Sequence, residues 1–228
     1  YVAVNTQRKL LGDKRMREAM WLALDKKTYI QSVYGGHAPP AASFLPPGIW
    51  GYDATLANRY DPERAKQLVK DVGYDGSELA LFTRIGGSID GKRAAGLMQA
   101  DWAKAGIRVR VQMMEWGEML KRTGRGDHDI TFLNWAGDNG DPDNFFTPNL
   151  TCDAVRGGGN KAQWCNPAFD RLLDQARKAT DPQQRSALYQ RAQRLVYDEV
   201  GVIPMVYPVY MTALNKRVKG SVPNPFTN

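Results

Sequence analysis

The sequence predicts an α/β domain in which a mixed β-sheet is flanked by helices. Short apolar segments typical of strands alternate with longer segments in which apolar residues recur every three or four positions, as on one helix face. Several helical segments begin with Asp or Asn followed by proline, a pattern that favours a helix start. With 228 residues, 43% of them hydrophobic, the chain can form its own core as one large or two small domains.

The first half of the chain contains most of the predicted strands. Alternating or continuous apolar residues predict strands at residues 1–5, 78–83, 108–113 and 129–135. The predicted helices span residues 13–33, 61–72, 92–105 and 116–123, with Asp13 and Asp61 as N-caps. Residues 35–51 are rich in proline and glycine and are predicted to form a loop.

The second half predicts two helices and one irregular strand. Asn166-Pro167 and Asp181-Pro182 each predict a helix start, the second helix running to about residue 199. Residues 202–210 are apolar but contain two prolines, which restrict such a strand to an edge or a bulge.

The most informative stretch is residues 134–146, Asn-Trp-Ala-Gly-Asp-Asn-Gly-Asp-Pro-Asp-Asn-Phe-Phe. The strand before it ends in a cluster of Gly, Asp and Asn, which tolerate turn dihedrals. This arrangement places the carboxylate of Asp138 at the start of a loop. From the residues alone, Asp138 either caps the turn or binds a ligand ammonium group, with main-chain pairing to an extended peptide alongside.

Net charge and motifs narrow the classes of function. The 31 basic and 24 acidic residues give a net charge of +7, but the basic residues are scattered, which indicates solvated surface charge and no nucleic-acid partner. The chain lacks the nucleophile-elbow, zinc-protease and phosphate-loop motifs, and its two histidines neighbour no obvious nucleophile. A calcium loop counted from Asp138 or Asp141 fails at Gly140 or Phe145. The sequence therefore favours binding without catalysis, and without a metal or cofactor.

Cys152 and Cys165 are the only cysteines and lie close together in the sequence. Two cysteines with no nearby histidine make a poor zinc site, because zinc takes four ligands. They predict either a disulfide, formed in an oxidising compartment, or two unrelated buried thiols. No apolar run approaches the ~20 residues that span a bilayer. The chain opens within a predicted strand and without Met, so we expect a fragment or processed piece, whose compartment this does not identify.

Several long motifs, in order along the chain, resemble the periplasmic dipeptide- and oligopeptide-binding proteins of ABC transporters, the family 5 extracellular solute-binding proteins. The resemblance extends over nearly the whole chain. Its motifs are residues 135–146 together with residues 2–5, 17–19, 60–66, 98–104 and 115–118, and the pair Cys152 and Cys165.

The resemblance implies a two-lobed protein of the type II periplasmic-binding fold that closes over its ligand. Residues 1–228 then form a single α/β lobe matching most of the C-terminal half, and the N-terminal lobe lies outside this chain. The implied function is the solute-binding component of a bacterial peptide importer, in the periplasm or tethered outside a Gram-positive cell. Its implied partners are a small peptide, the permease subunits at the membrane and the N-terminal lobe.

Matched residue by residue, the resemblance assigns Asp138 to the ligand's ammonium group. It assigns Asn134, Trp135 and Ala136 to main-chain contacts with the peptide, and Cys152 and Cys165 to a family disulfide. One position departs from the family, because an ungapped count places Ile85 where dipeptide-binding proteins have an arginine for the ligand carboxylate. Arg84, one residue away, can take the role of this arginine if the alignment of the loop shifts by one residue.

The departure keeps other functions open. A longer peptide or a different amine-bearing solute is compatible with a missing carboxylate clamp. A ligand-sensing protein or chaperone on the same fold is the alternative from another class.

Overall fold

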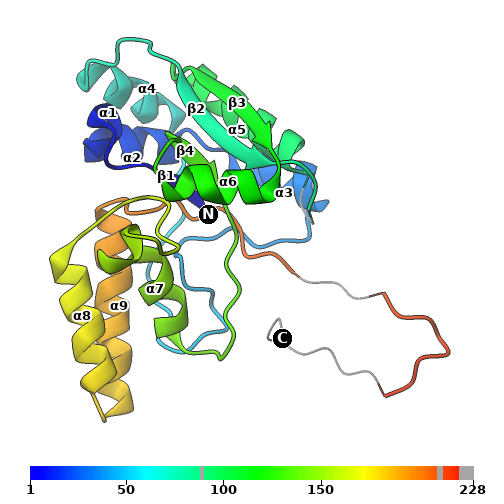
Figure 1. The fold of residues 1–228 in the computed structure, drawn as a ribbon, viewed down its shortest axis with the longest axis vertical. Helices are drawn as coiled ribbons and strands as arrows, with labels where there is room; N and C mark the ends of the chain where they lie inside the picture. The colour runs from blue at the N-terminus through cyan, green and yellow to red at the C-terminus, as the bar shows by residue number, and fades with distance from the viewer. Residues whose placement is uncertain (88–89, 210–212, 221–228) are drawn as a thin grey trace.

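A computed structural model of the chain describes residues 1–87, 90–209 and 213–220, and shows a sheet-containing part above a helical part (Figure 1). The sheet has four strands in the order β1-β4-β2-β3. Strand β1 (Val2–Val4) pairs antiparallel with β4 (Ile130–Phe132), and β2 (Leu79–Arg84) pairs parallel with both β4 and β3 (Val109–Met114). The predicted mixed α/β fold is confirmed.

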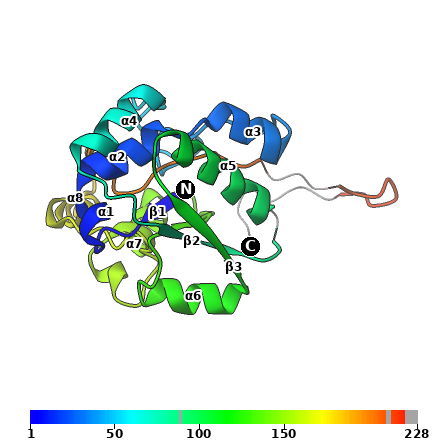
Figure 2. The same ribbon diagram turned by 90° about the horizontal axis from the view of Figure 1, so that it is seen from above.

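Helices cover both faces of this sheet. Helix α5 (Gly91–Lys104) lies on one face and α6 (Trp116–Gly124) on the other (Figure 2). The first core joins buried residues of β2, such as Leu81, to Met98 and Trp102 of α5. The remaining helices of this part are α1 (Lys9–Gly12), α2 (Lys14–Leu22), α3 (Lys26–Tyr34) and α4 (Pro62–Asp71).

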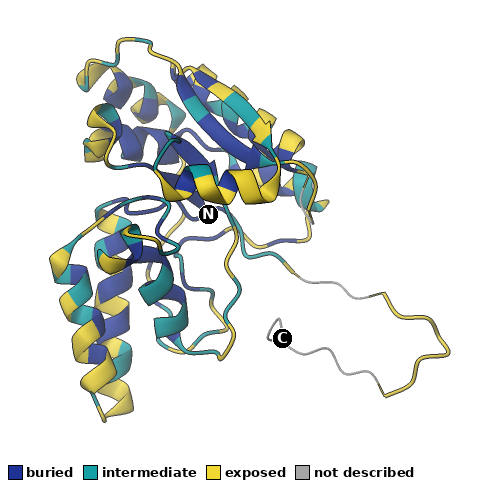
Figure 3. Ribbon diagram, viewed as in Figure 1, coloured by how far each residue is buried: buried dark blue, intermediate teal, exposed yellow. Residues whose placement is uncertain are grey.

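The helical part has its own core. It contains α7 (Pro142–Leu150), a 3₁₀ turn η1 (Asp153–Val155), α8 (Pro167–Lys178) and α9 (Pro182–Asp198). Phe146, Phe169 and Tyr189 are fully buried there, whereas the outer faces of α8 and α9 are exposed (Figure 3). Large aromatic side chains such as these contribute strongly to the packing of a core.

The predicted helix starts are confirmed where a side chain caps the first turn. Asp61 accepts a hydrogen bond from the Arg64 main-chain nitrogen at 2.9 Å, and Asp13, Asn166 and Asp181 cap their helices in the same way. Helix α4 is followed by Gly73 with a φ of +67°, a left-handed conformation that glycine adopts without strain.

The structure corrects several of the predicted elements. The single helix at residues 13–33 is two helices, because Asp25 interrupts it and caps α3 by accepting from the Thr28 nitrogen at 3.1 Å. Helices α1 and α7 were not predicted. The strand predicted at 129–135 is shorter, since β4 ends at Phe132 and, after Leu133, the main chain of residues 134–136 pairs with no described strand.

The final segment is also not a strand. Ile203 and Val206 make single bridges, to Val2 and Pro40 respectively, because Pro204 and Pro208 have no N–H for a continuous ladder. Tyr210, at the end of that prediction, lies outside the described residues. Over the part of the chain that the structure describes, no helix is long and apolar enough to cross a membrane.

Candidate functional site

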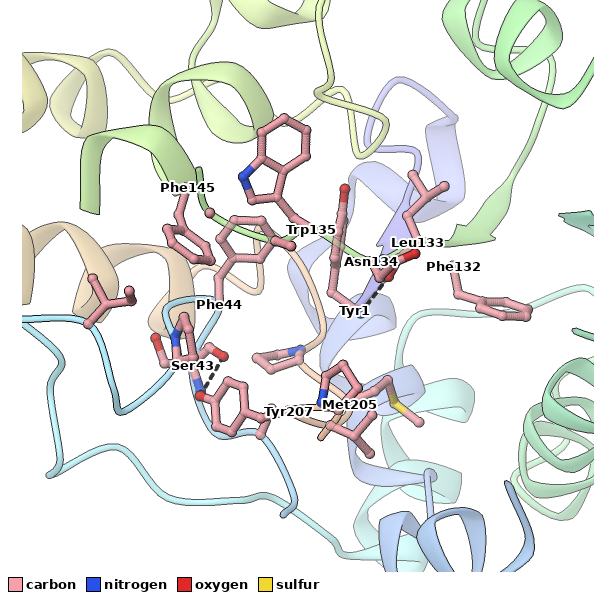
Figure 4. Close-up of a pocket in the computed structure, with 18 of the residues that line it drawn as sticks. Tyr1, Ser43, Phe44, Phe132, Leu133, Asn134, Trp135, Phe145, Met205 and Tyr207 are labelled. Atoms are coloured by element: carbon pink, nitrogen blue, oxygen red, sulfur yellow. Dashed lines mark hydrogen bonds between the residues drawn. The ribbon is translucent and has the colours of Figure 1, made fainter. Parts of the chain in front are cut away.

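The chain that leaves β4 forms one wall of a cavity of about 270 Å³. Residues 133–137 make up this wall, and residues 41–49 and 204–208 approach from the other sides (Figure 4). The cavity thus lies where segments distant in sequence meet, beside the end of the sheet. Asn134, Trp135 and Ala136, three of the residues assigned to ligand contacts, line it.

The main chain of this wall is only partly paired. Leu133 exchanges two hydrogen bonds with Tyr1, the Leu133 nitrogen donating at 3.0 Å and the Tyr1 nitrogen donating at 2.9 Å. Beyond Leu133, the main-chain groups of residues 134–136 make no hydrogen bond to any described residue. Unpaired strand-like backbone is what an extended peptide requires for main-chain pairing.

Asp138 lies directly after this wall and is exposed. Its main-chain nitrogen donates to the Asn144 side-chain oxygen at 3.0 Å, which fixes the turn. Its carboxylate makes no hydrogen bond or ion pair with the described residues, unlike Asp141 and Asp143, which bind Arg185 and Arg177. Asp138 follows Gly137, which lines the cavity, and does not line it itself.

The backbone at Gly137 packs directly against an aromatic ring. A Cβ atom at this position would lie 2.4 Å from the Cε2 atom of Phe145, a distance that side-chain carbons do not tolerate. Phe145 is itself buried on α7. The close approach sets the position at which the chain turns toward Asp138.

Arg84 is the last residue of β2. Its guanidinium carbon is 5.1 Å from the centre of the Trp116 ring, and its Nε donates to the Gly86 carbonyl at 3.2 Å. Arg84, Trp116 and Asn134 line a second, smaller cavity of about 40 Å³. Arg84 makes no ion pair with the residues that the structure describes.

Ile85 is placed differently from Arg84. Its nitrogen donates to the Met114 carbonyl at 2.8 Å, which extends the β2–β3 pairing, and its side chain is 64% exposed. Only Arg84 of the two therefore lines a cavity with Asn134.

The side chains that line the larger cavity carry no formal charge. None of the described residues that line it is acidic or basic. Burial raises the pKa of the phenol groups of Tyr1, Tyr29 and Tyr207, so these hydroxyls stay protonated. Lys26 does not line the cavity; its Nζ donates at 2.6 Å to the carbonyl of Ala41, which does, and at 2.9 Å to Asn58.

The predicted disulfide is present between Cys152 and Cys165, with 2.06 Å between the sulfurs. It fastens the chain after α7 to the start of α8, and Asp170 of α8 accepts from the Cys152 nitrogen at 3.3 Å. Across the described ranges, no group of three or more His, Cys, Asp or Glu side chains could hold a metal ion.

Sequence reasoning missed most of the cavity walls. Tyr1, Phe44 and Tyr207 come from segments more than 40 residues apart, and each is an ordinary core aromatic by its local pattern. Their convergence depends on the fold. The bridge between Pro40 and Val206 joins the two segments that contain Phe44 and Tyr207, and no local signal announces that pairing.

The comparisons with known proteins agree with this architecture. The chain is 44% identical over 233 residues to a protein named di/tripeptide-binding protein 4 from Pseudomonas aeruginosa, matching all of this chain and 44% of that protein. Two solved structures align with TM-scores of 0.85 and 34% identity, each over 91% of this chain. One is a dipeptide-binding protein from Pseudoalteromonas sp. SM9913 with Met-Leu, covered over 42% of its length. The other is the periplasmic binding protein DppA from Helicobacter pylori with the peptide STSA, covered over 41% of its length.

The chain spans less than half the length of these relatives, which their names describe as binding proteins and not as enzymes. The family described as bacterial extracellular solute-binding proteins, family 5 middle region, matches residues 1–157. The four-stranded mixed sheet with its helices has the fold of its peptide-bound structural relatives. This chain belongs to the bacterial extracellular solute-binding proteins of family 5.

Proposed function

We propose that this chain is part of the solute-binding component of a bacterial ABC peptide importer, in which it binds the amino end of a di- or oligopeptide. The names of the relatives support a peptide ligand, since they include di/tripeptide-binding proteins from Pseudomonas aeruginosa and a dipeptide-binding protein from Escherichia coli. Two similar structures contain bound peptides. The role is binding without catalysis or a cofactor.

In this proposal residues 1–228 form a single α/β lobe, and the peptide lies in a cleft between it and an N-terminal lobe outside this chain. The partners are then the peptide, that lobe and the permease subunits at the membrane. The protein works in the periplasm, or tethered outside a Gram-positive cell. The description of the family as extracellular supports such a location.

The uncommitted carboxylate of Asp138 carries the proposal. It is exposed, it has no partner among the described residues, and it follows a main-chain segment that is itself unpaired. A carboxylate in this position can accept charge-assisted hydrogen bonds from an α-ammonium group. The main chain of Asn134, Trp135 and Ala136 is then available to pair with the peptide backbone, whatever its side chains.

Arg84 is proposed for the carboxyl end of the ligand. It lines the smaller cavity together with Asn134, which also lines the larger one. Its guanidinium has no acidic partner in the described structure, so it can form a bidentate pair with a carboxylate.

The test is the variant Asp138→Asn in the complete protein, with dipeptide affinity measured by calorimetry. Asparagine keeps the shape of the side chain but removes the charge that faces the ammonium group. Losing one partner of a charged pair in a closed site costs ~2–5 kcal/mol, a fall in affinity of at least about thirtyfold.

Asp153→Asn is the matched control. Asp153 is also exposed, has no side-chain partner among the described residues and lines neither cavity. Its variant is expected to bind dipeptide like the wild type. Equal affinities for Asp138→Asn and the wild type would contradict the anchoring role.

A further inference from the structure

The larger cavity has walls that suit one chemical class of side chain. Most of its lining residues are apolar or aromatic, and they surround a space that also touches the unpaired main chain beside Asp138 (Figure 4). The large ones among them include Tyr1, Phe44, Phe132, Trp135, Met205 and Tyr207.

The polar side-chain atoms of Tyr207, Ser43 and Trp135 are already hydrogen-bonded within the protein. The Tyr207 hydroxyl accepts from the Ser43 nitrogen at 3.1 Å and donates to the Ser43 carbonyl at 2.8 Å. The Ser43 hydroxyl donates to the Gln193 side-chain oxygen at 3.0 Å. The Trp135 indole nitrogen donates to the Asn144 carbonyl at 3.0 Å. Ring faces and aliphatic groups are therefore what these residues offer to the cavity.

A charged side chain would find no partner in this space. The described residues that line the cavity include no acidic or basic side chain. The nearby Lys26 does not line the cavity, and its amine donates to the Ala41 carbonyl and the Asn58 side chain. A charged side chain that enters loses hydration and meets only neutral groups, the main chain of residues 134–136 and the Asn134 amide, without an opposite charge, which is unfavourable.

The size of the cavity fits a single side chain. Its volume of about 270 Å³ is close to the roughly 300 Å³ of the smallest pockets that enclose a small ligand, so it has room for a bulky side chain. A side chain can thus enter while the peptide backbone stays beside residues 134–136.

We infer that this cavity is the specificity pocket of the site, and that it selects peptides in which one residue has a bulky apolar side chain, aliphatic or aromatic. The inference rests on the proposed peptide-binding function and names its preferred ligands. The backbone contacts and Asp138 hold any peptide, and the cavity discriminates between side chains.

The first experiment measures the affinity of the complete protein for matched dipeptides by calorimetry. Ala-Ala is the reference, and the first or the second residue is replaced in turn by Phe, Leu, Glu or Lys. In one of the two positions, Phe and Leu are expected to bind at least about tenfold more tightly than Ala, since each buried methylene alone is worth about that factor. Glu and Lys at that position are expected to bind no more tightly than Ala.

The second experiment fills the cavity. Val206 lines it, so Val206→Phe is expected to remove the tenfold preference, and Phe, Leu and Ala dipeptides should then bind the variant with similar affinities. Val209→Phe is the matched control, because Val209 is 57% exposed and does not line the cavity. A general structural defect would lower the affinity for every dipeptide, which separates it from a loss of selectivity.

The outcomes distinguish the two claims. Equal affinity for all dipeptides, whatever the side chain, would contradict the inferred specificity pocket but not the proposed peptide binding. The same selectivity in Val206→Phe and Val209→Phe would have the same consequence. If no dipeptide binds at all, the proposed function is wrong and the pocket falls with it.

Discussion

Arg185 on α9 forms an ion pair with Asp141, the N-cap of α7, with 2.9 Å between Nη2 and Oδ2. Asp141 also accepts from the Asp143 nitrogen at 2.9 Å, which begins the helix. The guanidinium of Arg185 lies 4.9 Å from the centre of the Trp50 ring, in the proline-rich loop. The turn that contains Asp138 is therefore tied at its far end to a long helix and to that loop.

Because of this ion pair, Asp141→Ala is expected to lower the free energy of unfolding by more than the removal of a helix cap alone would. Removing an Asp cap costs about 1 kcal/mol, and the partly buried ion pair adds up to about 1 kcal/mol. Asp181→Ala is the matched control, since Asp181 caps α9 through Gln183 and Gln184 and forms no ion pair with the described residues. Urea unfolding measures both free energies.

The same two variants test whether the tie matters for binding. Asp141→Ala is expected to weaken dipeptide affinity, because the turn that positions Asp138 is released at one end. Asp181→Ala is expected to leave it unchanged. Equal losses of stability and of affinity in the two variants would show that Arg185 contributes nothing beyond the cap.

Helix α7 shows what the sequence could have predicted here. Asp141-Pro142 is the same start signal that correctly predicts the helices after Asp61 and Asp181, but it directly follows a cluster of Gly, Asn and Asp that indicates a turn. The signal was present, and the surrounding turn residues outweighed it. Likewise, Asp25 is an N-cap within a continuous apolar pattern, and the pattern alone cannot show that the chain changes direction there.

The sequence predicts only the part of the site that is formed by consecutive residues. Residues 134–138 form a contiguous motif, and the structure places residues 134–136 at a cavity. The opposing walls depend on main-chain pairing between distant segments, such as the Ala41 nitrogen donating to the Met205 carbonyl at 3.1 Å. Such pairings follow from the assembled fold and leave no periodic pattern in the sequence.

Arg84→Gln is expected to weaken the binding of dipeptides with a free carboxyl group by ~2–5 kcal/mol, because a ligand carboxylate loses its bidentate partner. Dipeptide amides, which lack that charge, are expected to bind wild type and variant equally. Calorimetry on the complete protein with both ligand forms makes the comparison. Arg64→Gln is the control, since Arg64 is exposed on α4 and lines neither cavity. If the variant binds free-carboxyl dipeptides like the wild type, Arg84 has no role at the ligand's carboxyl end.

Reducing the Cys152–Cys165 bond is expected to lower the free energy of unfolding by about 3 kcal/mol, the value for a closed loop of about 15 residues. The cysteines are 13 positions apart in the sequence. Urea unfolding with and without a thiol reductant measures the difference. The double variant Cys152→Ser with Cys165→Ser is the control and should not respond to the reductant. Identical unfolding midpoints for oxidised and reduced wild type would contradict a stabilising role.

His128 is expected to make the fold sensitive to acid. It is fully buried, its Nε2 lies 2.7 Å from the Lys161 carbonyl, and its Nδ1 has no partner among the described residues. Nε2 therefore carries the proton of the neutral ring, and adding a second proton at Nδ1 would place an unsolvated charge in the core. Burial accordingly lowers the pKa of His128 to about 4, from an ordinary value of 6.5.

Because the folded pKa lies below the unfolded one, the unfolded chain binds more protons between pH 6.5 and pH 4. The contribution of His128 to stability is therefore fully present above pH 6.5 and declines as the pH falls, by about 3 kcal/mol at pH 4. Urea unfolding at pH 7 and pH 4.5 is expected to show a smaller acid loss for His128→Phe than for wild type. The exposed His37 supplies the control, and His37→Phe should keep the wild-type loss. The same acid loss in His128→Phe and wild type would assign the effect to the carboxylates that titrate over this range.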